Sequence, residues 1–202
     1  MRTRTTTTRT ITPSVYYFGT SVVLLTTLMP DGRTNITPMS SAWALGSTYV
    51  LGLGTHGQGA RNVLRTGELV INLPDASLAD RVERIAPTTA AWPVPEVKRD
   101  LYRHEQDKWR LAGLTPTPSD EVAPHRVAEC PVQLEARVTD VVPFDEDAVA
   151  VHARVVHAHA HEDLVLAGTS YIDLDRWRPM YYTFRHYFAQ GERLAVSFKA
   201  EQ

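Results

Sequence analysis

The order of apolar and polar positions predicts a chain built mainly from β-strands. β-Branched and aromatic residues are concentrated in residues 15–28, and residues 30–32, Pro-Asp-Gly, supply the chemistry of a reversing turn. Residues 34–39 are then expected to form the return arm of a hairpin. Residues 48–53 have the composition of a further strand, which ends among flexible glycines.

Two short helices are expected after these strands. Residues 59–66 are long enough for two helical turns, and residues 68–73 return as a nearly continuous apolar strand. In the second helix, Leu78, Val82 and Ile85 are spaced for one apolar face, and Asp75 stands where an N-cap is expected. The chain therefore runs as strand, helix, strand and helix in this region.

A proline-rich segment over residues 86–124 interrupts the strand pattern and is expected to run over the surface. Within it, residues 105–112 are the one plausible helix, which Gly113 is placed to end. The strand pattern resumes at residues 132–142, 148–160 and 164–169.

Strands without regularly interleaved long helices favour an antiparallel barrel or sandwich over a doubly wound sheet. The predicted fold class is therefore mainly β with short helices. With 202 residues, the chain has the length of one domain. We expect a flexible arm rich in threonine and arginine at residues 1–12 and a single domain at residues 13–202.

Charge and cysteine content exclude several classes of protein. The chain has 21 basic and 23 acidic residues, so no overall positive charge attracts nucleic acid or an anionic membrane. No segment approaches the about 18 consecutive apolar residues of a membrane helix. The single cysteine, Cys130, excludes an internal disulfide and a cysteine-rich zinc site, and it is expected to be buried and inert. A cytoplasmic location is expected.

Candidate chemistry is concentrated in residues 37–41 and 55–62. The second stretch passes through a glycine-rich bend into a helix start, where unpaired N–H groups and the helix dipole favour a bound phosphate. Thr55, Gln58 and Arg61 would add polar or charged contacts. The alternative is a tight turn whose glycines only permit the geometry, because no Walker or dinucleotide-binding pattern is present.

Taken in order, several short motifs resemble the flavin reductase-like FMN-binding split barrels, a family that includes flavoredoxin. The likeness runs from about residue 18 to residue 162. It is carried by residues 35–41 (NITPMSS), 62–63 (NV), 66–72 (TGELVIN), 107–109 (DKW), 113–114 (GL) and 129–135 (ECPVQLE). The resemblance implies a six-stranded, antiparallel, Greek-key-like split β-barrel that forms a homodimer and binds FMN.

The resemblance also implies which residues hold the cofactor. The segment at residues 35–41 would lie along the flavin ring and ribityl chain, the bend at residues 55–62 would meet the phosphate, and Lys108 would reach that phosphate. The implied cofactor-binding residues are Asn35, Thr37, Pro38, Met39, Ser40, Ser41, Thr55, His56, Gly57, Gln58, Gly59, Ala60, Arg61, Asn62 and Lys108.

The chain departs from the family pattern at two positions. Family members commonly have threonine where this chain has Gly59, so Gly59→Thr is expected to tighten FMN binding if the added hydroxyl caps the helix. Flavoredoxin-like members often have tryptophan where this chain has Ser41, and Trp43 is the nearest candidate to replace it.

The implied activity is an oxidoreductase of the flavin reductase type. Electrons would pass from NADH, NADPH or a partner protein through FMN to a free flavin or a small acceptor. Because a flavin carries out the electron chemistry itself, no catalytic triad is needed, and Ser40 and Ser41 are interpreted as hydrogen-bond donors to the cofactor. An FMN-holding electron carrier or sensor without turnover is the alternative. Neither nucleic acid nor a membrane is expected as a partner.

The histidines support a different hypothesis. His157, His159 and His161 alternate with other residues on a predicted strand, so their side chains would share one face and two of them could hold a metal. A solvated strand face and a histidine beside the cofactor are the alternatives.

The aromatic run at residues 177–188 is expected to pack in the core, at a dimer interface or over the flavin edge.

Overall fold

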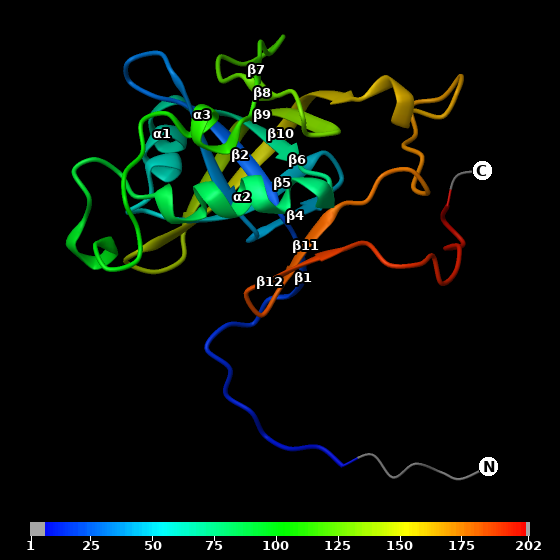
Figure 1. The fold of residues 1–202 in the computed structure, drawn as a ribbon, viewed down its shortest axis with the longest axis horizontal. Coiled ribbons are helices and arrows are strands. Elements are labelled where there is room, and N and C mark those ends of the chain that lie inside the picture. The colour runs from blue at the N-terminus through cyan, green and yellow to red at the C-terminus, as the bar shows by residue number, and fades with distance from the viewer. Residues whose placement is uncertain (1–6, 201–202) are drawn as a thin grey trace.

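The computed structural model describes residues 7–200 and has one main antiparallel sheet that is curled into a barrel (Figure 1). Its seven strands are hydrogen-bonded in the order β3-β2-β6-β9-β10-β5-β4. Their bounds are Val23–Leu28 for β2, Thr34–Met39 for β3, Ala42–Leu45 for β4, Thr48–Gly54 for β5, Glu68–Leu73 for β6, Val132–Pro143 for β9 and Ala148–Ala160 for β10.

The barrel closes at Ser40 and Ser41. Strands β3 and β4 lie at opposite edges of the sheet, yet only these two residues separate them along the chain. The two edges must therefore be close together, which curls the sheet. When β3 and β4 are counted as one bent strand, the barrel has the six strands that the resemblance to the split barrels implied.

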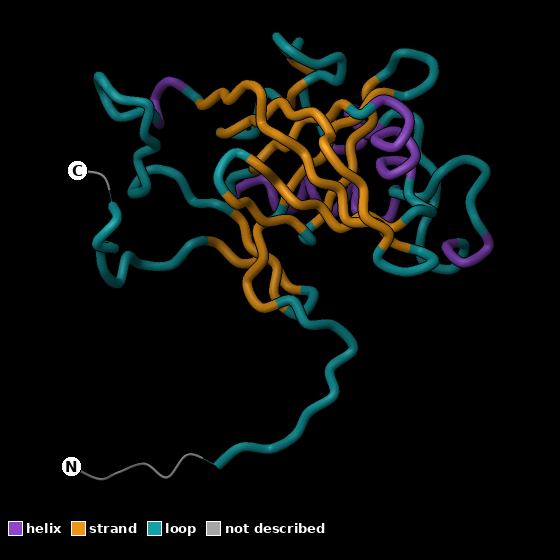
Figure 2. Tube along the Cα trace, turned by 180° about the vertical axis from the view of Figure 1, so that it is seen from behind, coloured by secondary structure: helices purple, strands orange, loops and turns teal. Residues whose placement is uncertain are grey.

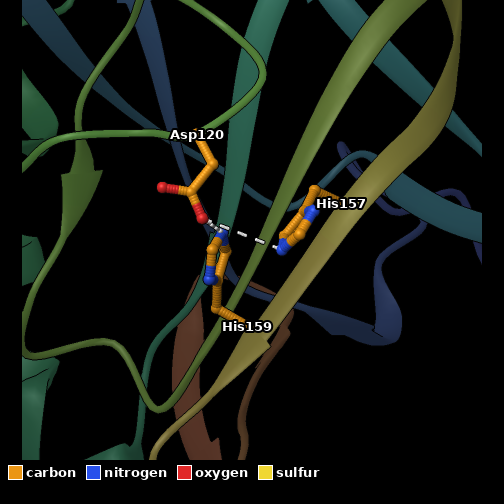
Figure 3. Close-up of side chains that lie close together, drawn as sticks. All are labelled: Asp120, His157 and His159. Carbon is orange, nitrogen blue, oxygen red and sulfur yellow. Dashed lines mark ion pairs between the residues drawn. The ribbon is translucent and has the colours of Figure 1, made fainter.

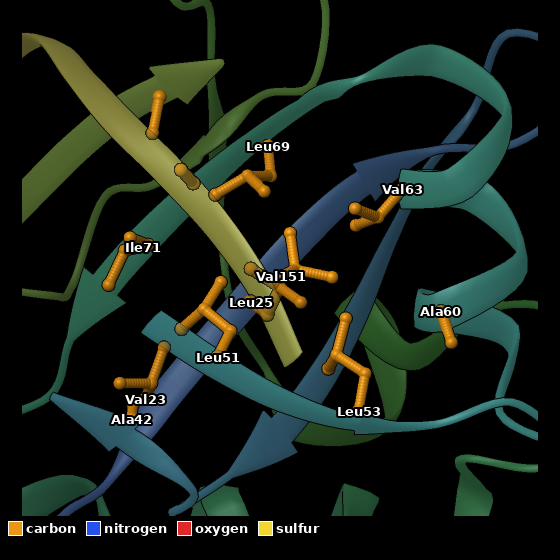
Figure 4. Close-up of a cluster of buried hydrophobic side chains, with 12 residues drawn as sticks. Val23, Leu25, Ala42, Leu51, Leu53, Ala60, Val63, Leu69, Ile71 and Val151 are labelled. Carbon is orange, nitrogen blue, oxygen red and sulfur yellow. The ribbon is translucent and has the colours of Figure 1, made fainter. Parts of the chain in front are cut away.

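Apolar side chains fill the barrel interior (Figure 4). Val23 and Leu25 of β2 meet Leu51 of β5 and Ile71 of β6 there, each almost inaccessible to solvent. The spacing of two between Val23 and Leu25 places both on the inner face of their strand. This interior fixes the position of β3 and β5, on which the site described below depends.

A second apolar cluster lies on the outer face of the same sheet, under α2 (Ala79–Ile85) and α3 (Lys108–Ala112). In this cluster, Leu24 of β2 and Ile36 of β3 pack with Val82 and Ile85 of α2. Strand β2 is therefore buried on both faces. The sole cysteine, Cys130, belongs to this cluster and is buried, as predicted.

Short helices flank these elements in the region between β5 and β9. Asp75 accepts a hydrogen bond from the Ser77 amide at 2.9 Å, which confirms the predicted cap. The helical elements are α1 (Gln58–Thr66), η1 (Ala76–Leu78), η2 (Ala86–Thr88) and η3 (Glu96–Lys98). Two small strands, β7 (Pro116–Thr117) and β8 (Arg126–Val127), pair within the proline-rich segment.

A separate three-stranded sheet projects from the barrel (Figure 2). It joins β1 (Phe18–Ser21) to the hairpin of β11 (Met180–Thr183) and β12 (His186–Ala189) in the order β1-β11-β12. The N-terminal segment leads away from this sheet, and its residues 7–13 have no helix or strand. The remainder of the predicted arm, residues 1–6, lies outside the described residues.

Two expectations about elements were wrong. Residues 164–169 do not form a strand: Glu162–Leu164 is a 3-10 turn, η4, and Val165 makes only an isolated bridge to Ile172. The helix expected at residues 105–112 begins only at Lys108, because the Asp107 carboxylate caps it there by accepting from the Arg110 amide.

Within the described part of the chain, no helix is long and apolar enough to cross a membrane.

Candidate functional site

A cavity of about 450 Å³ lies where the barrel edge, the start of α1 and the projecting sheet meet. This volume is in the range of small-molecule sites. Its lining residues come from five parts of the chain: Val15, Tyr17 and Val22; Thr37, Pro38, Met39, Ser40 and Ser41; Gly52, Leu53, Gly54, Gly57, Gly59 and Ala60; Val82, Ala86, Thr89, Lys98 and Tyr102; and Tyr182, Arg185 and Tyr187.

One wall of the cavity is the bend between β3 and β4. The Ser41 hydroxyl lies 3.2 Å from the Tyr17 hydroxyl, so one of them donates a hydrogen bond to the other. The Tyr17 ring contacts Tyr182, which contacts Tyr187 in turn, with centroid separations of 5.9 and 5.3 Å. The wall therefore offers hydroxyl groups at a bent strand beside a row of aromatic rings.

The first turn of α1 forms another wall and presents backbone donors. The helix has no side-chain cap at Gly57 and no acidic residue in its first turn. The amides of Gln58 and Arg61 bond to the carbonyls of Thr89 and Gly57. The helix itself supplies no acceptor for the amides of Gly59 and Ala60, because they lie in its first turn. Both residues line the cavity, where the helix dipole favours an anion.

Lys98 brings a positive charge to the same end of the cavity. A Cβ built on Gly57 would lie 3.8 Å from the Lys98 ammonium nitrogen, which places that nitrogen beside the start of α1. The ammonium also lies over the Tyr102 ring, 4.9 Å from its centroid. Partial burial lowers the pKa of Lys98, and a bound anion would offset that effect.

Arg185 reaches the cavity from the turn between β11 and β12. Phe184 and Arg185 have positive φ angles of 46° and 67°, which is the left-handed region that residues with a side chain rarely occupy. Two-residue hairpin turns of this kind usually contain asparagine and glycine. The backbone is therefore strained at this turn, and the turn places Arg185 in the cavity lining.

The lining contains the basic residues Lys98 and Arg185 and no aspartate, glutamate, histidine or cysteine. It therefore favours an anionic ligand with a flat apolar part. The lining offers no carboxylate or imidazole for general acid–base catalysis. None of His157, His159 and His161 lines this cavity, so no histidine of that group stands beside a ligand here.

Eight of the fifteen sequence-predicted site residues line the cavity. They are Thr37, Pro38, Met39, Ser40, Ser41, Gly57, Gly59 and Ala60. The other seven lie outside the lining, each bonded to the protein itself. They are Asn35, Thr55, His56, Gln58, Arg61, Asn62 and Lys108.

Lys108 lies behind the cavity wall and supports it. Its ammonium is buried and donates to Asn35 Oδ1 at 2.8 Å and to the Ile36 carbonyl at 2.9 Å. The Asn35 amide in turn donates to the Thr37 hydroxyl at 3.0 Å, and Thr37 lines the cavity. Burial lowers the pKa of Lys108 to about 7. Lys108 therefore acts on a ligand only through Asn35 and Thr37.

Thr55 and His56 face the β9–β10 hairpin. The Thr55 hydroxyl donates to the Asp147 carbonyl, and His56 Nε2 lies 2.9 Å from Asp147 Oδ1. Gln58 and Asn62 bond to each other and are buried in the packing of α1. These residues hold the bend in place and do not reach the cavity.

At the two positions where the sequence departs from the family pattern, the structure gives different outcomes. Ser41 lines the cavity, where its hydroxyl is bonded to that of Tyr17. Trp43, in contrast, points outward and is 57% exposed. Trp43 therefore does not replace a tryptophan at position 41. At Gly59 there is no room for a side chain, because Thr37 fills that space. The expectation that Gly59→Thr would tighten FMN binding is therefore wrong.

Several lining residues were missed by sequence reasoning. Lys98 stands in the proline-rich segment without a recognisable motif, so no sequence pattern indicated it. Tyr182, Arg185 and Tyr187 belong to the aromatic run noted at residues 177–188, and packing over a ligand edge was one of its expected roles. Their position depends on the pairing of β11 with β1, which joins the two ends of the chain.

Comparison with known proteins gives the same architecture. The model of the flavin reductase like domain matches residues 15–191. The chain is 42% identical over 194 residues to YdfE of Bacillus subtilis (strain 168), an uncharacterized protein, with 95% of this chain and 93% of YdfE covered.

Two solved structures have a similar fold. Flavoredoxin of Desulfovibrio vulgaris (Miyazaki F) has a TM-score of 0.78 at 20% identity, covering 96% of this chain and 99% of flavoredoxin. An FMN-binding protein from Thermus thermophilus, solved with bound p-hydroxybenzaldehyde, has a TM-score of 0.67 at 13% identity, covering 96% and 100%. At these identities the likeness is one of fold.

Proposed function

Because the chain belongs to the family of the flavin reductase like domain, we propose that it binds FMN in the cavity and acts as an oxidoreductase. The observation that carries the proposal is the polarity of the cavity. The lining combines the first turn of α1, with Lys98 beside it, and the bend at Ser40 and Ser41, with Tyr17 bonded to Ser41. FMN has the matching shape, a dianionic phosphate joined to a flat ring.

Each wall has a task in this arrangement. The amides of Gly59 and Ala60 and the Lys98 ammonium bind the phosphate, and the acid-free lining avoids repulsion of its charge. The Ser40 and Ser41 hydroxyls orient the polar edge of the ring, and Tyr17 and Tyr182 cover its apolar surface. When bound, FMN supplies the hydride and electron chemistry.

We propose NADH or NADPH as the electron donor and a free flavin or another small aromatic compound as the acceptor. A role as an electron carrier or sensor without turnover is the second candidate, because the lining offers no carboxylate or imidazole for acid–base catalysis. We also propose a homodimer. A cytoplasmic location fits the single buried cysteine.

An anaerobic optical titration separates enzyme from carrier. The purified chain is loaded with FMN, and NADH and NADPH are added separately in the absence of oxygen. A reductase loses the flavin absorbance band with at least one nucleotide. If dithionite bleaches the band while both nucleotides leave it unchanged, the chain is a carrier or sensor. If the chain retains no FMN after gel filtration and shows no binding by calorimetry, the proposed function is wrong.

A further inference from the structure

Two of the histidines that the flavin site does not use converge with a carboxylate on the outside of the barrel. His157 Nε2 and His159 Nε2 lie 3.8 and 3.9 Å from the same oxygen, Asp120 Oδ2 (Figure 3). The three donor atoms all lie within 4.8 Å of one another. From this geometry, we propose that Asp120, His157 and His159 bind one divalent transition-metal ion.

The backbone explains why the two imidazoles meet. His157 and His159 are two positions apart on β10, so their side chains share one face of the strand. Their ring centroids are 4.6 Å apart. His161 follows at the same spacing but lies beyond the end of β10, where its Nε2 contacts the Ala128 carbonyl at 2.8 Å. The site therefore contains two of the three alternating histidines.

The buried carboxylate of Glu135 holds Asp120 in place. It accepts hydrogen bonds from the backbone amides of Asp120 at 2.9 Å, Glu121 at 2.6 Å and Val122 at 3.2 Å. These bonds fix the loop that presents Asp120 to β10.

His159 is oriented by the same carboxylate. Its Nε2 lies 2.7 Å from Glu135 Oε1, and only 17% of its side chain is exposed. A metal at the site would displace the proton that His159 shares with Glu135. Glu135 keeps its three backbone donors when that happens, so it is not left unpaired. Glu135 therefore positions His159 in the metal-free chain, and the metal would take its place at Nε2.

The charges around the site suit a cation. Asp120 forms no ion pair with lysine or arginine among the residues that the structure describes, and its neighbours are the two histidines. Arg126 Nε lies 3.8 Å from Glu135 Oε1. Arg126 is thus paired with Glu135, and the Asp120 carboxylate remains for the ion.

The distances and ligand types select the metal. In a tetrahedral zinc site with bonds of about 2.0 Å, donor atoms lie roughly 3.3 Å apart. The observed 3.8 and 3.9 Å separations need movements of about half an ångström, and the exposed side chains of Asp120 and His157 can make them. Two imidazoles and one carboxylate favour Zn²⁺, Co²⁺, Ni²⁺ or Cu²⁺ over Mg²⁺ or Ca²⁺. Water would complete the coordination.

The test is calorimetric titration of the untagged full-length chain with Zn²⁺ alone, and with Mg²⁺ as the control ion. We expect one Zn²⁺ per chain and no Mg²⁺ binding. His157→Ala and Asp120→Asn each should weaken Zn²⁺ binding at least tenfold. His152→Ala, which removes a histidine earlier on the same strand, should leave it unchanged. His159→Gln, which keeps a donor for Glu135, should also weaken it.

Thermal unfolding provides a second readout and shows that each variant folds. Zn²⁺ should raise the melting temperature of the wild-type chain and of His152→Ala, but not that of His157→Ala. The proposal is overturned if the wild-type chain binds no Zn²⁺, or if His157→Ala binds Zn²⁺ with wild-type affinity. Neither result depends on flavin binding, so this test is independent of the proposed function.

Discussion

The hydroxyl oxygen of Thr37 lies 2.6 Å from the place where a Cβ on Gly59 would stand, and the Thr37 Cβ lies 3.1 Å from it. Strand β3 therefore packs directly against the first turn of α1, and only glycine fits between them. The cavity lies at this contact, so the close approach sets the distance between the two walls that would hold FMN.

Substitution of Gly59 should therefore be harmful. Gly59→Ala and Gly59→Thr are expected to lower the free energy of unfolding by about 1 to 3 kcal/mol through overpacking, and to weaken FMN binding. Urea unfolding and calorimetry measure the two effects. The cost of Gly59→Ala should fall in a Thr37→Ala background, because the hydroxyl that it meets is then gone.

Gly54→Ala is the matched control for Gly59. A Cβ there would meet its nearest neighbour, the Asp147 carbonyl, at an ordinary 3.8 Å. The account of the Thr37 contact fails if Gly59→Ala is as stable as Gly54→Ala.

The buried Lys108 should make stability depend on pH. Its pKa falls to about 7 in the folded chain, against about 10.4 when unfolded, so the unfolded chain binds more protons between these values. Stability must then rise with pH across this window. Between pH 7.0 and 8.5, the wild-type chain should gain about 1.5 kcal/mol relative to Lys108→Gln, whose neutral side chain still donates. Urea unfolding at both values measures this gain, and equal pH dependence of the two chains would refute it.

The strained turn at Phe184 and Arg185 predicts a trade between stability and binding. Arg185→Gly relieves a φ of 67° and should raise the free energy of unfolding by about 0.5 to 1 kcal/mol. The same change removes a cation from the cavity and should weaken FMN binding by about three- to tenfold. Arg185→Lys keeps both the strain and the charge, so it is the control. A Gly variant that binds FMN as tightly as the wild type would show that Arg185 has no part in the site.

Exposed apolar side chains near the projecting sheet predict the homodimer. Leu45 on the edge strand β4 is 74% exposed, and Phe18 and Phe184 form an edge-to-face pair at the surface. Light scattering should give about 45 kDa, twice the 22.6 kDa of one chain. Leu45→Glu should shift this mass towards the monomer, whereas Leu194→Glu in the C-terminal tail should not. A wild-type monomer at micromolar concentration would contradict the proposed dimer.

Much of the barrel could be predicted from the sequence because its strands follow a strong local pattern. The bounds expected for the strands at residues 34–39, 68–73 and 148–160 agree with β3, β6 and β10. Each has a dense apolar or β-branched composition bounded by turn residues. The strand expected at residues 164–169 failed because the chain turns there: the Thr169 amide donates to the Leu166 carbonyl, and Gly168 has a positive φ of 75°.

The candidate site was predicted only where it is local in sequence. The bend at residues 37–41 and the start of α1 carry their own motifs, and both line the cavity. Lys98 and Lys108 show the limit of such reasoning, because only the packing of the proline-rich segment decides which lysine reaches the cavity. The aromatic hairpin of β11 and β12 likewise depends on a pairing with β1 across the whole chain.

The measurement that tests the central claim most directly compares FMN with riboflavin, which lacks the phosphate, by calorimetry. If the phosphate lies between the first turn of α1 and Lys98, the wild-type chain binds FMN at least tenfold more tightly than riboflavin. Lys98→Met should lower this preference by about tenfold, while Arg61→Ala and Lys108→Gln leave it unchanged. Equal affinity of the wild-type chain for FMN and riboflavin would contradict the account.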